Sequence, residues 1–117
     1  MKSSPDLASV IRKDGQVWAI TSVAVAGNSM EPTLKSGDWW LVRKTQKVKP
    51  GQIVAFWEPN RIDLLAVKRV DHQVAGSSWM LGDNPHTSVD SRSFGPVEPR
   101  HIVGRLLFRF RPMFRKS

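Results

Sequence analysis

The fold is decided by two apolar runs, Gln52-Ile53-Val54-Ala55-Phe56-Trp57 and Leu64-Leu65-Ala66-Val67-Lys68-Arg69-Val70, with Glu58-Pro59-Asn60 between them. Both runs are rich in β-branched, aromatic and aliphatic residues and have the length of strands. Glu-Pro-Asn is typical of a turn, because proline and asparagine favour turn conformations. This stretch therefore predicts two short β-strands separated by a turn.

The rest of the chain repeats this pattern of short apolar runs between proline and glycine turns. We expect strands over residues 17–26, 39–43, 52–57, 64–70, 78–81 and 102–110. The only helical pattern covers residues 6–13. The sequence thus predicts a mainly β domain with little helix.

The run at 102–110 has two different faces. Leu106, Phe108 and Phe110 alternate with arginines, and alternating side chains of a strand point to opposite sides. We interpret this run as an amphipathic edge or outer strand. Residues 82–99 form the one long loop, and a loop of that size in a small domain is more often functional than not.

Composition restricts the chemistry. The chain has 117 residues, is 40% hydrophobic and lacks cysteine, which fits one domain and excludes a thiol nucleophile and a disulfide framework. The three histidines, His72, His86 and His101, show no paired ligand spacing, so we expect no metal and no cofactor.

The charge is strongly positive. The formal net charge is +8, and after Glu98 there are basic and aromatic residues but no acidic ones. Such a C-terminus could contact a membrane surface or nucleic acid, although a solvated basic face is the simpler interpretation. We expect no nucleic-acid partner and leave a peripheral membrane contact open.

The chain shows neither a transmembrane segment nor a signal peptide, which predicts a cytoplasmic protein with membrane association as an open alternative. We divide it into an N-terminal segment over 1–15 that is expected to be partly flexible, a main β-rich domain over 16–111 and a basic tail over 112–117.

Ser29 is the first candidate for chemistry. It lies in Gly27-Asn28-Ser29-Met30-Glu31-Pro32-Thr33-Leu34, where an apolar strand ends in a turning segment that would expose the hydroxyl. A serine in a turn is more often a simple cap, and a serine nucleophile needs a base within hydrogen-bond reach.

Lys68 is the candidate base. In strand geometry it shares a face with Leu64, Ala66 and Val70, and burial among apolar side chains lowers the pKa of a lysine. An arginine could not serve, because it stays protonated. The alternative is a lysine whose ammonium reaches solvent from a half-buried strand.

The loop Gly82-Asp83-Asn84-Pro85-His86-Thr87-Ser88-Val89-Asp90-Ser91-Arg92-Ser93-Phe94-Gly95 concentrates short polar side chains. Asp90 and Arg92 could pair and hold the loop, and Ser88 could exchange a hydrogen bond with a catalytic lysine. A solvated surface loop is the alternative.

Five segments occur in one order: Ser29 to Leu34, Gly37-Asp38, Pro50 to Val54, Lys68-Arg69-Val70 and the loop from Gly82 to Gly95. In this order the chain resembles the type I signal peptidase family over roughly residues 23–110. The segment Ser29-Met30-Glu31-Pro32-Thr33 is also similar to LexA-type self-cleaving repressors, whereas the loop is more specific. The resemblance implies a compact antiparallel β domain and a serine endopeptidase with a Ser/Lys dyad.

Carried over residue by residue, the resemblance makes Ser29 the nucleophile, Lys68 the base and the Ser29 main-chain N–H an oxyanion donor. Ser88 would orient the lysine, and Asp90 and Arg92 would support it. The substrate cleft would include Gly27, Met30 and Pro32, with small substrate residues preferred near the scissile bond.

Two features depart from the family. Gly27 stands where some members have an oxyanion-stabilising hydroxyl, and the chain shows neither membrane tethers nor a second β-domain. The sequences of Leu64 to Arg69 and of Gly82 to Val97 are most similar to those of small maturation proteases of nickel-type superoxide dismutases. The implied function is removal of an N-terminal leader from a precursor protein. The alternatives are a LexA-like self-cleaving regulator and a non-enzymatic basic module that binds nucleic acid or membrane.

Overall fold

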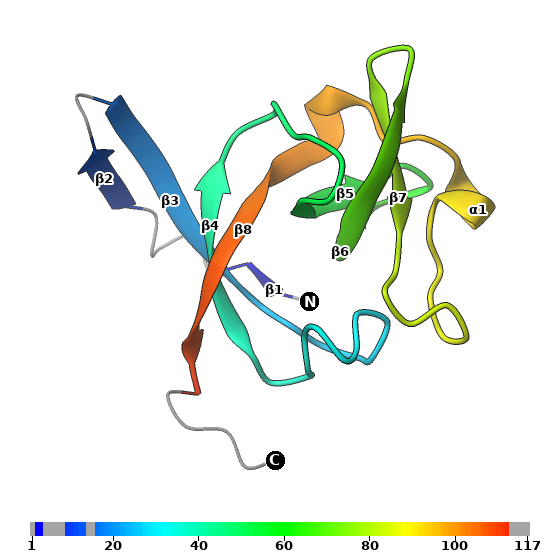
Figure 1. Cartoon of the computed structure of the whole chain (residues 1–117), viewed down its shortest axis with the longest axis horizontal. Coiled ribbons are helices and arrows are strands. Elements are labelled where there is room, and N and C mark those ends of the chain that lie inside the picture. The colour runs from blue at the N-terminus through cyan, green and yellow to red at the C-terminus, as the bar shows by residue number, and fades with distance from the viewer. Residues whose placement is uncertain (1, 4–8, 14–15, 113–117) are drawn as a thin grey trace.

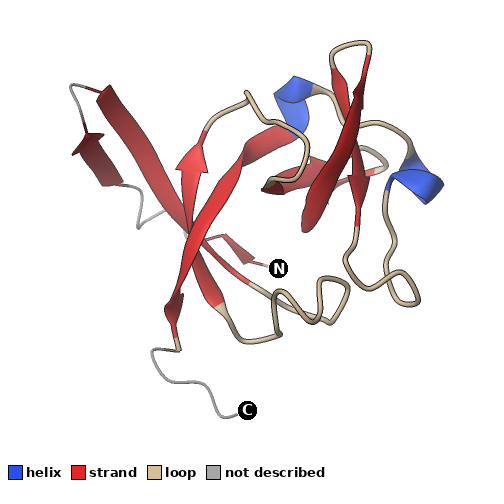
Figure 2. Ribbon diagram, in the orientation of Figure 1, coloured by secondary structure: helices blue, strands red, loops and turns tan. Residues whose placement is uncertain are grey.

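A computed structural model of the chain describes residues 2–3, 9–13 and 16–112. The strands are β1 (Lys2–Ser3), β2 (Ser9–Lys13), β3 (Gln16–Ala24), β4 (Trp39–Lys44), β5 (Ile53–Glu58), β6 (Arg61–Val74), β7 (Ser77–Leu81) and β8 (Ile102–Arg111), with two short helices, α1 (Ser91–Phe94) and η2 (Pro99–His101). The fold is therefore mainly β with little helix, as the sequence predicts (Figures 1 and 2).

The strands form one antiparallel sheet in the order β1-β3-β4-β8-β5-β6-β7, with β2 also paired to β3. The expectation that the last strand lies at an edge was wrong, because β8 pairs with β4 on one side and with β5 on the other. Polar alternation reports which face of a strand is solvated, and it says nothing about whether its hydrogen-bonding edges are paired. Gly104 fits this central position, since a Cβ there would lie 2.1 Å from the carbonyl oxygen of Arg43 on β4.

The helix expected at 6–13 was also wrong. Residues 9–13 form β2, which pairs with β3 from Ser9 opposite Ile20 to Lys13 opposite Gln16, and residues 6–8 lie outside the described residues. Pairing with a neighbouring strand overrides a short local helical pattern, because helices of this length are marginal without tertiary support.

All six expected strands form, with small differences at their ends. The largest difference is in β6, which spans 14 residues because it pairs first with β5 and then with β7. The expected loop at 82–99 contains α1, whose first turn is capped by the side chain of Asp90. That aspartate therefore has a structural role as well as its place in the site.

Two groups of buried side chains make up the core. The first contains Met30 and Leu34, which flank the turn after Ser29, together with Val67 of β6. The second contains Val70 of β6 and Met80 of β7. Strand β6 thus contributes to both groups, and Lys68 lies between its two anchoring valines.

Candidate active site

Ser29 lies in the connection between β3 and β4, directly after the apolar run of β3. Gly27 has a φ of 83°, a left-handed conformation that side chains other than glycine rarely adopt. Met30 and Leu34 are almost fully buried, whereas Ser29 itself is half-buried. The turn is therefore anchored on both sides of a serine that remains accessible.

Lys68 of β6 reaches this serine. Its Nζ lies 2.8 Å from Ser29 Oγ, although the two residues are 39 positions apart in the chain. The lysine side chain is only 6% exposed. Burial lowers the pKa of Lys68, and the negative charges of Asp90 and Glu58 oppose this effect without cancelling it.

The loop after β7 holds the serine turn from outside. The Asn84 N–H donates to the carbonyl oxygen of Ser29 at 2.9 Å, and the Asn84 side-chain amide donates to the carbonyl of Asn28 at 3.1 Å. The Asp83 N–H contacts the sulfur of Met30 at 3.3 Å. These contacts fix the main chain of the Ser29 turn against the end of β7 (Figure 1).

Asp83 also ties β6 to this loop. Arg69 donates through Nε and a terminal nitrogen to the two oxygens of Asp83 at 2.9 and 2.8 Å, and Thr33 donates its hydroxyl to the same carboxylate at 2.6 Å. The hydrogen bonds from Arg69 lower the pKa of Asp83, and Thr33 adds to this effect. The carboxylate of Asp83 therefore links β6, the Ser29 turn and the loop after β7.

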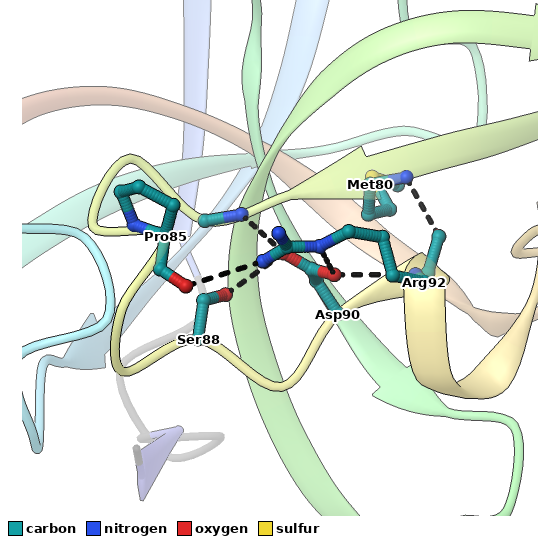
Figure 3. A network of polar contacts seen from close by, with 7 residues as sticks. Met80, Pro85, Ser88, Asp90 and Arg92 are labelled. Atoms are coloured by element: carbon teal, nitrogen blue, oxygen red, sulfur yellow. Dashed lines mark hydrogen bonds and ion pairs between the residues drawn. The ribbon is translucent and has the colours of Figure 1, made fainter.

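A second ion pair organises the far side of the loop (Figure 3). Asp90 is 1% exposed and accepts from the Arg92 side chain, from the Arg92 N–H, from the Gly82 N–H and from the hydroxyl of Ser88. Burial by itself would raise the pKa of Asp90, but these hydrogen bonds outweigh it and hold the pKa low. The carboxylate is therefore kept charged near Lys68.

Ser88 is thus hydrogen-bonded to Asp90. Its hydroxyl donates to Asp90 Oδ2 at 3.0 Å, and within the described part of the chain no hydrogen bond joins it to Lys68. The absence of a side chain at Gly82 lets Ser88 approach the Ser29 turn closely. A Cβ at position 82 would lie 2.0 Å from Ser88 Oγ and 2.8 Å from the carbonyl oxygen of Ser29.

A cleft of about 280 Å³ opens beside the two residues. Its wall consists of residues from two backbone segments, 25–30 and 64–68, completed by Glu58, Thr87 and Val89. Gly27 and Met30 line it, whereas Pro32 is exposed and does not. The three histidines do not line the cleft either.

One edge of β6 is open along this cleft. Strand β5 pairs with β6 up to Arg69, whereas β7 pairs only with the part from Arg69 to Val74. On the side away from β5, residues 64–68 therefore have no partner strand among the described residues. Such an edge can accept an extended peptide as an additional strand.

Within the described residues, no group of three or more histidine, aspartate or glutamate side chains is arranged to hold a metal ion. Nor does the described part of the chain contain a helix of sufficient length and hydrophobicity to cross a bilayer. The site itself presents a hydroxyl beside a buried amine, with an unpaired strand edge alongside.

Comparison with known proteins agrees with this arrangement. The chain belongs to the Peptidase S24-like family, whose sequence profile matches residues 8–107.

Its relatives narrow the class further. The chain is 29% identical over 115 residues to mitochondrial inner membrane protease subunit 1 of Xenopus tropicalis, covering 78% of this chain and 69% of that protein. It is 30% identical over 122 residues to the mitochondrial ATP-independent inner membrane protease subunit 1a of Arabidopsis thaliana, covering 81% and 73%. It is 32% identical over 112 residues to the probable signal peptidase I-1 of Synechocystis, covering 95% of this chain and 52% of that protein. The chain is therefore a peptidase of the signal-peptidase-like serine protease class.

Sequence reasoning missed three parts of the site. Arg69 of β6 and Asp83 of the loop after β7 form an ion pair, and Glu58 reaches the cleft from the end of β5. The adjacent cations Lys68 and Arg69 could have indicated this ion pair. Because side chains alternate along a strand, Arg69 points to the side opposite Lys68, where an acidic partner is expected.

Proposed function

We propose that the protein is a serine endopeptidase in which Ser29 is the nucleophile and Lys68 its general base. The observation that carries the proposal is the 2.8 Å contact between Lys68 Nζ and Ser29 Oγ in a cleft, with the lysine buried and its pKa lowered. A charged ammonium donates in this contact, whereas a neutral amine accepts the hydroxyl proton at the same distance. Desolvation favours the neutral form, which is the form that catalysis needs.

The reaction follows from this proton transfer. Lys68 takes the proton of Ser29 as Oγ attacks the carbonyl carbon of the scissile peptide bond, and the Ser29 N–H stabilises the oxyanion that forms. The resulting ammonium then protonates the leaving amine, which departs as the C–N bond breaks and leaves an ester on Ser29. In the second half Lys68 takes a proton from water, whose oxygen attacks the ester, and returns it to Oγ as the acid product leaves.

The supporting residues act through position and charge. Asp90, fixed by Arg92 and Ser88, keeps a negative charge near Lys68 that stabilises the ammonium formed during the reaction. The balance between this attraction and desolvation sets the pKa of the base. Ser88, Asp90 and Arg92 are therefore proposed as positioning residues.

The substrate is proposed to bind as an extended strand on the open edge of β6, between residues 25–28 and 64–67. Main-chain hydrogen bonds would give affinity, and the cleft wall would read alternate side chains. Gly27 and Met30 line the cleft beside Ser29, and the resemblance to signal peptidases implies small residues at the scissile bond. Residues 16–111 are proposed as the catalytic domain.

We further propose that the substrate is the N-terminal leader of a precursor protein, most specifically that of a nickel-type superoxide dismutase. Support comes from the sequences of Leu64 to Arg69 and of Gly82 to Val97, which resemble those of small maturation proteases of that kind. One of the relatives is a probable signal peptidase, and a leader is a substrate of the kind that this name indicates.

The experiment incubates the purified protein with such a precursor and identifies the new N-terminus by mass spectrometry. The wild type is expected to release the leader, and Ser29→Ala and Lys68→Ala are each expected to lose cleavage almost completely, because the two residues act as a unit. Ser36→Ala and Lys49→Ala, two exposed positions away from the cleft, serve as matched controls.

Cleavage retained in Ser29→Ala or Lys68→Ala would refute the dyad. Cleavage of an unrelated leader but not of this precursor would refute only the substrate. Cleavage of the chain itself at a rate independent of protein concentration would favour the self-cleaving regulator instead.

A further inference from the structure

Glu58 has an unusual environment for a carboxylate. It ends β5, is only 8% exposed and lines the cleft that holds Ser29 and Lys68. Within the described residues its side chain makes no hydrogen bond and no ion pair, and its charge acts on Lys68 without contact. Buried charges are normally paired, so a buried carboxylate that faces an open cleft points to a cationic ligand.

The strand register places Glu58 on the same side of the sheet as the catalytic lysine. Val54 pairs with Lys68 and Phe56 with Ala66, so alternation along β5 directs Glu58 to the face of Lys68. A register shift follows Trp57, after which Glu58 pairs with Arg61. Glu58 nevertheless lines the cleft that contains Lys68 and lies close enough to act on the charge of that lysine.

The same register sets the distance from the reacting bond. Trp57 pairs with Leu65, which is three residues along β6 from Lys68, and Glu58 follows Trp57 and pairs with Arg61 after the register shift. Three residues of strand span about 10 Å. An extended peptide on the open edge of β6 would present its second and fourth residues from the scissile bond on this face, within reach of the carboxylate.

We propose that Glu58 is a specificity-determining residue that selects substrates with a lysine or arginine two or four residues from the scissile bond. The inference rests on the proposed function, because it concerns the peptide bound in that cleft. It adds a charge requirement to the small residues expected at the bond itself. The substrate class is thus a leader or other extended segment with a cation close to its cleavage point.

The test uses three sets of extended peptides with alanine at the scissile bond. The sets carry lysine, glutamine or glutamate at the second or fourth position from the bond, and kcat/KM is measured for each. The wild type is expected to prefer lysine over glutamine by about tenfold at one of these positions, with glutamate slower still. In Glu58→Gln the three values at that position are expected to fall within about twofold of one another.

The matched control is Glu98→Gln, since Glu98 is an exposed carboxylate on Arg100 outside the cleft and its loss should leave the order unchanged. Glu58→Asp retains the charge on a shorter side chain and is expected to keep part of the preference. Ratios within one variant are compared, so a partly unfolded variant still gives a result.

The outcomes separate the two proposals. Equal rates for the three peptide sets at both positions in the wild type, or an unchanged order in Glu58→Gln, would overturn the role of Glu58 and leave the peptidase standing. Failure of the wild type to cleave any peptide or the precursor would overturn the proposed function and this inference with it.

Discussion

The two sides of β6 carry neighbouring cations that differ in their exposure and in their hydrogen-bond partners. On one side Arg69 is about one-third exposed and fully engaged, with two bonds to Asp83 and one to the carbonyl of Gly51 at 2.7 Å. On the other side Lys68 is buried, and among the described residues its Nζ has the Ser29 hydroxyl as its only hydrogen-bond partner. The first cation holds structure together, whereas the second is kept in an environment that favours loss of its proton.

This difference shows how one strand can supply both stability and reactivity. The Arg69–Asp83 pair positions the loop that fastens the Ser29 turn, so its charge acts on geometry. Burial lowers the pKa of Lys68, so its environment acts on chemistry. Guanidinium suits the first role because it binds carboxylates in a planar fork, and an amine suits the second because its pKa is easily shifted.

Exchanging lysine and arginine at positions 68 and 69 is expected to have the largest effect. Lys68→Arg keeps the positive charge but cannot act as a base, so we expect kcat/KM to fall by about 10³-fold or more. Arg69→Lys keeps the charge but loses the bidentate geometry, and we expect a fall of less than about tenfold together with a stability loss of about 1 kcal/mol, since the pair is partly exposed. Peptide cleavage and thermal unfolding measure the two effects.

The results for the two variants, Lys68→Arg and Arg69→Lys, can each contradict the proposed roles. Wild-type activity in Lys68→Arg would contradict a base at this position. Complete loss of activity in a well-folded Arg69→Lys would show that the positions do not divide the work in this way.

A smaller effect concerns stability and pH. Because the pKa of Lys68 is lower in the folded protein than the ordinary 10.5, the buried charge destabilises the fold at pH values below the folded pKa. As pH rises through the folded pKa toward 10.5, the folded state loses the proton first and this penalty disappears. Lys68→Met is therefore expected to raise the free energy of unfolding by about 1–3 kcal/mol at low and neutral pH, with the gain shrinking as pH approaches the unfolded value.

Chemical denaturation of wild type and Lys68→Met across this pH range would check the sign. Lys49→Met replaces an exposed lysine and serves as the control, with no comparable gain expected. A gain that grows with pH would contradict a buried lysine whose pKa is lowered.

The sequence carried much of the fold and of the candidate site. Apolar runs between turn residues predicted six of the strands, because alternation and turn chemistry are local signals. The helix at 6–13 and the edge position of the last strand were wrong, because strand pairing is decided by distant partners such as β3 for β2 and β4 and β5 for β8.

The site shows the same difference between features that local sequence predicts and features that depend on distant partners. Ser29 and Lys68 were found from a turn, a buried face and a family resemblance, and the structure brings them together. Glu58 was not found, because its place in the cleft depends on a register shift after Trp57 that no local pattern reports. The Arg69–Asp83 pair likewise depends on the way the loop folds back over β6.

The most direct measurement is an NMR titration of the protein with ¹³C-labelled lysine, with the Lys68 signal assigned by its absence in Lys68→Arg. We predict that this signal titrates at a pH clearly below 10.5, and that it still does so in Ser29→Ala, because burial rather than the hydroxyl lowers the pKa. Titration of Lys68 at or above 10.5, together with the other lysines, would contradict the neutral amine on which the proposed catalysis depends.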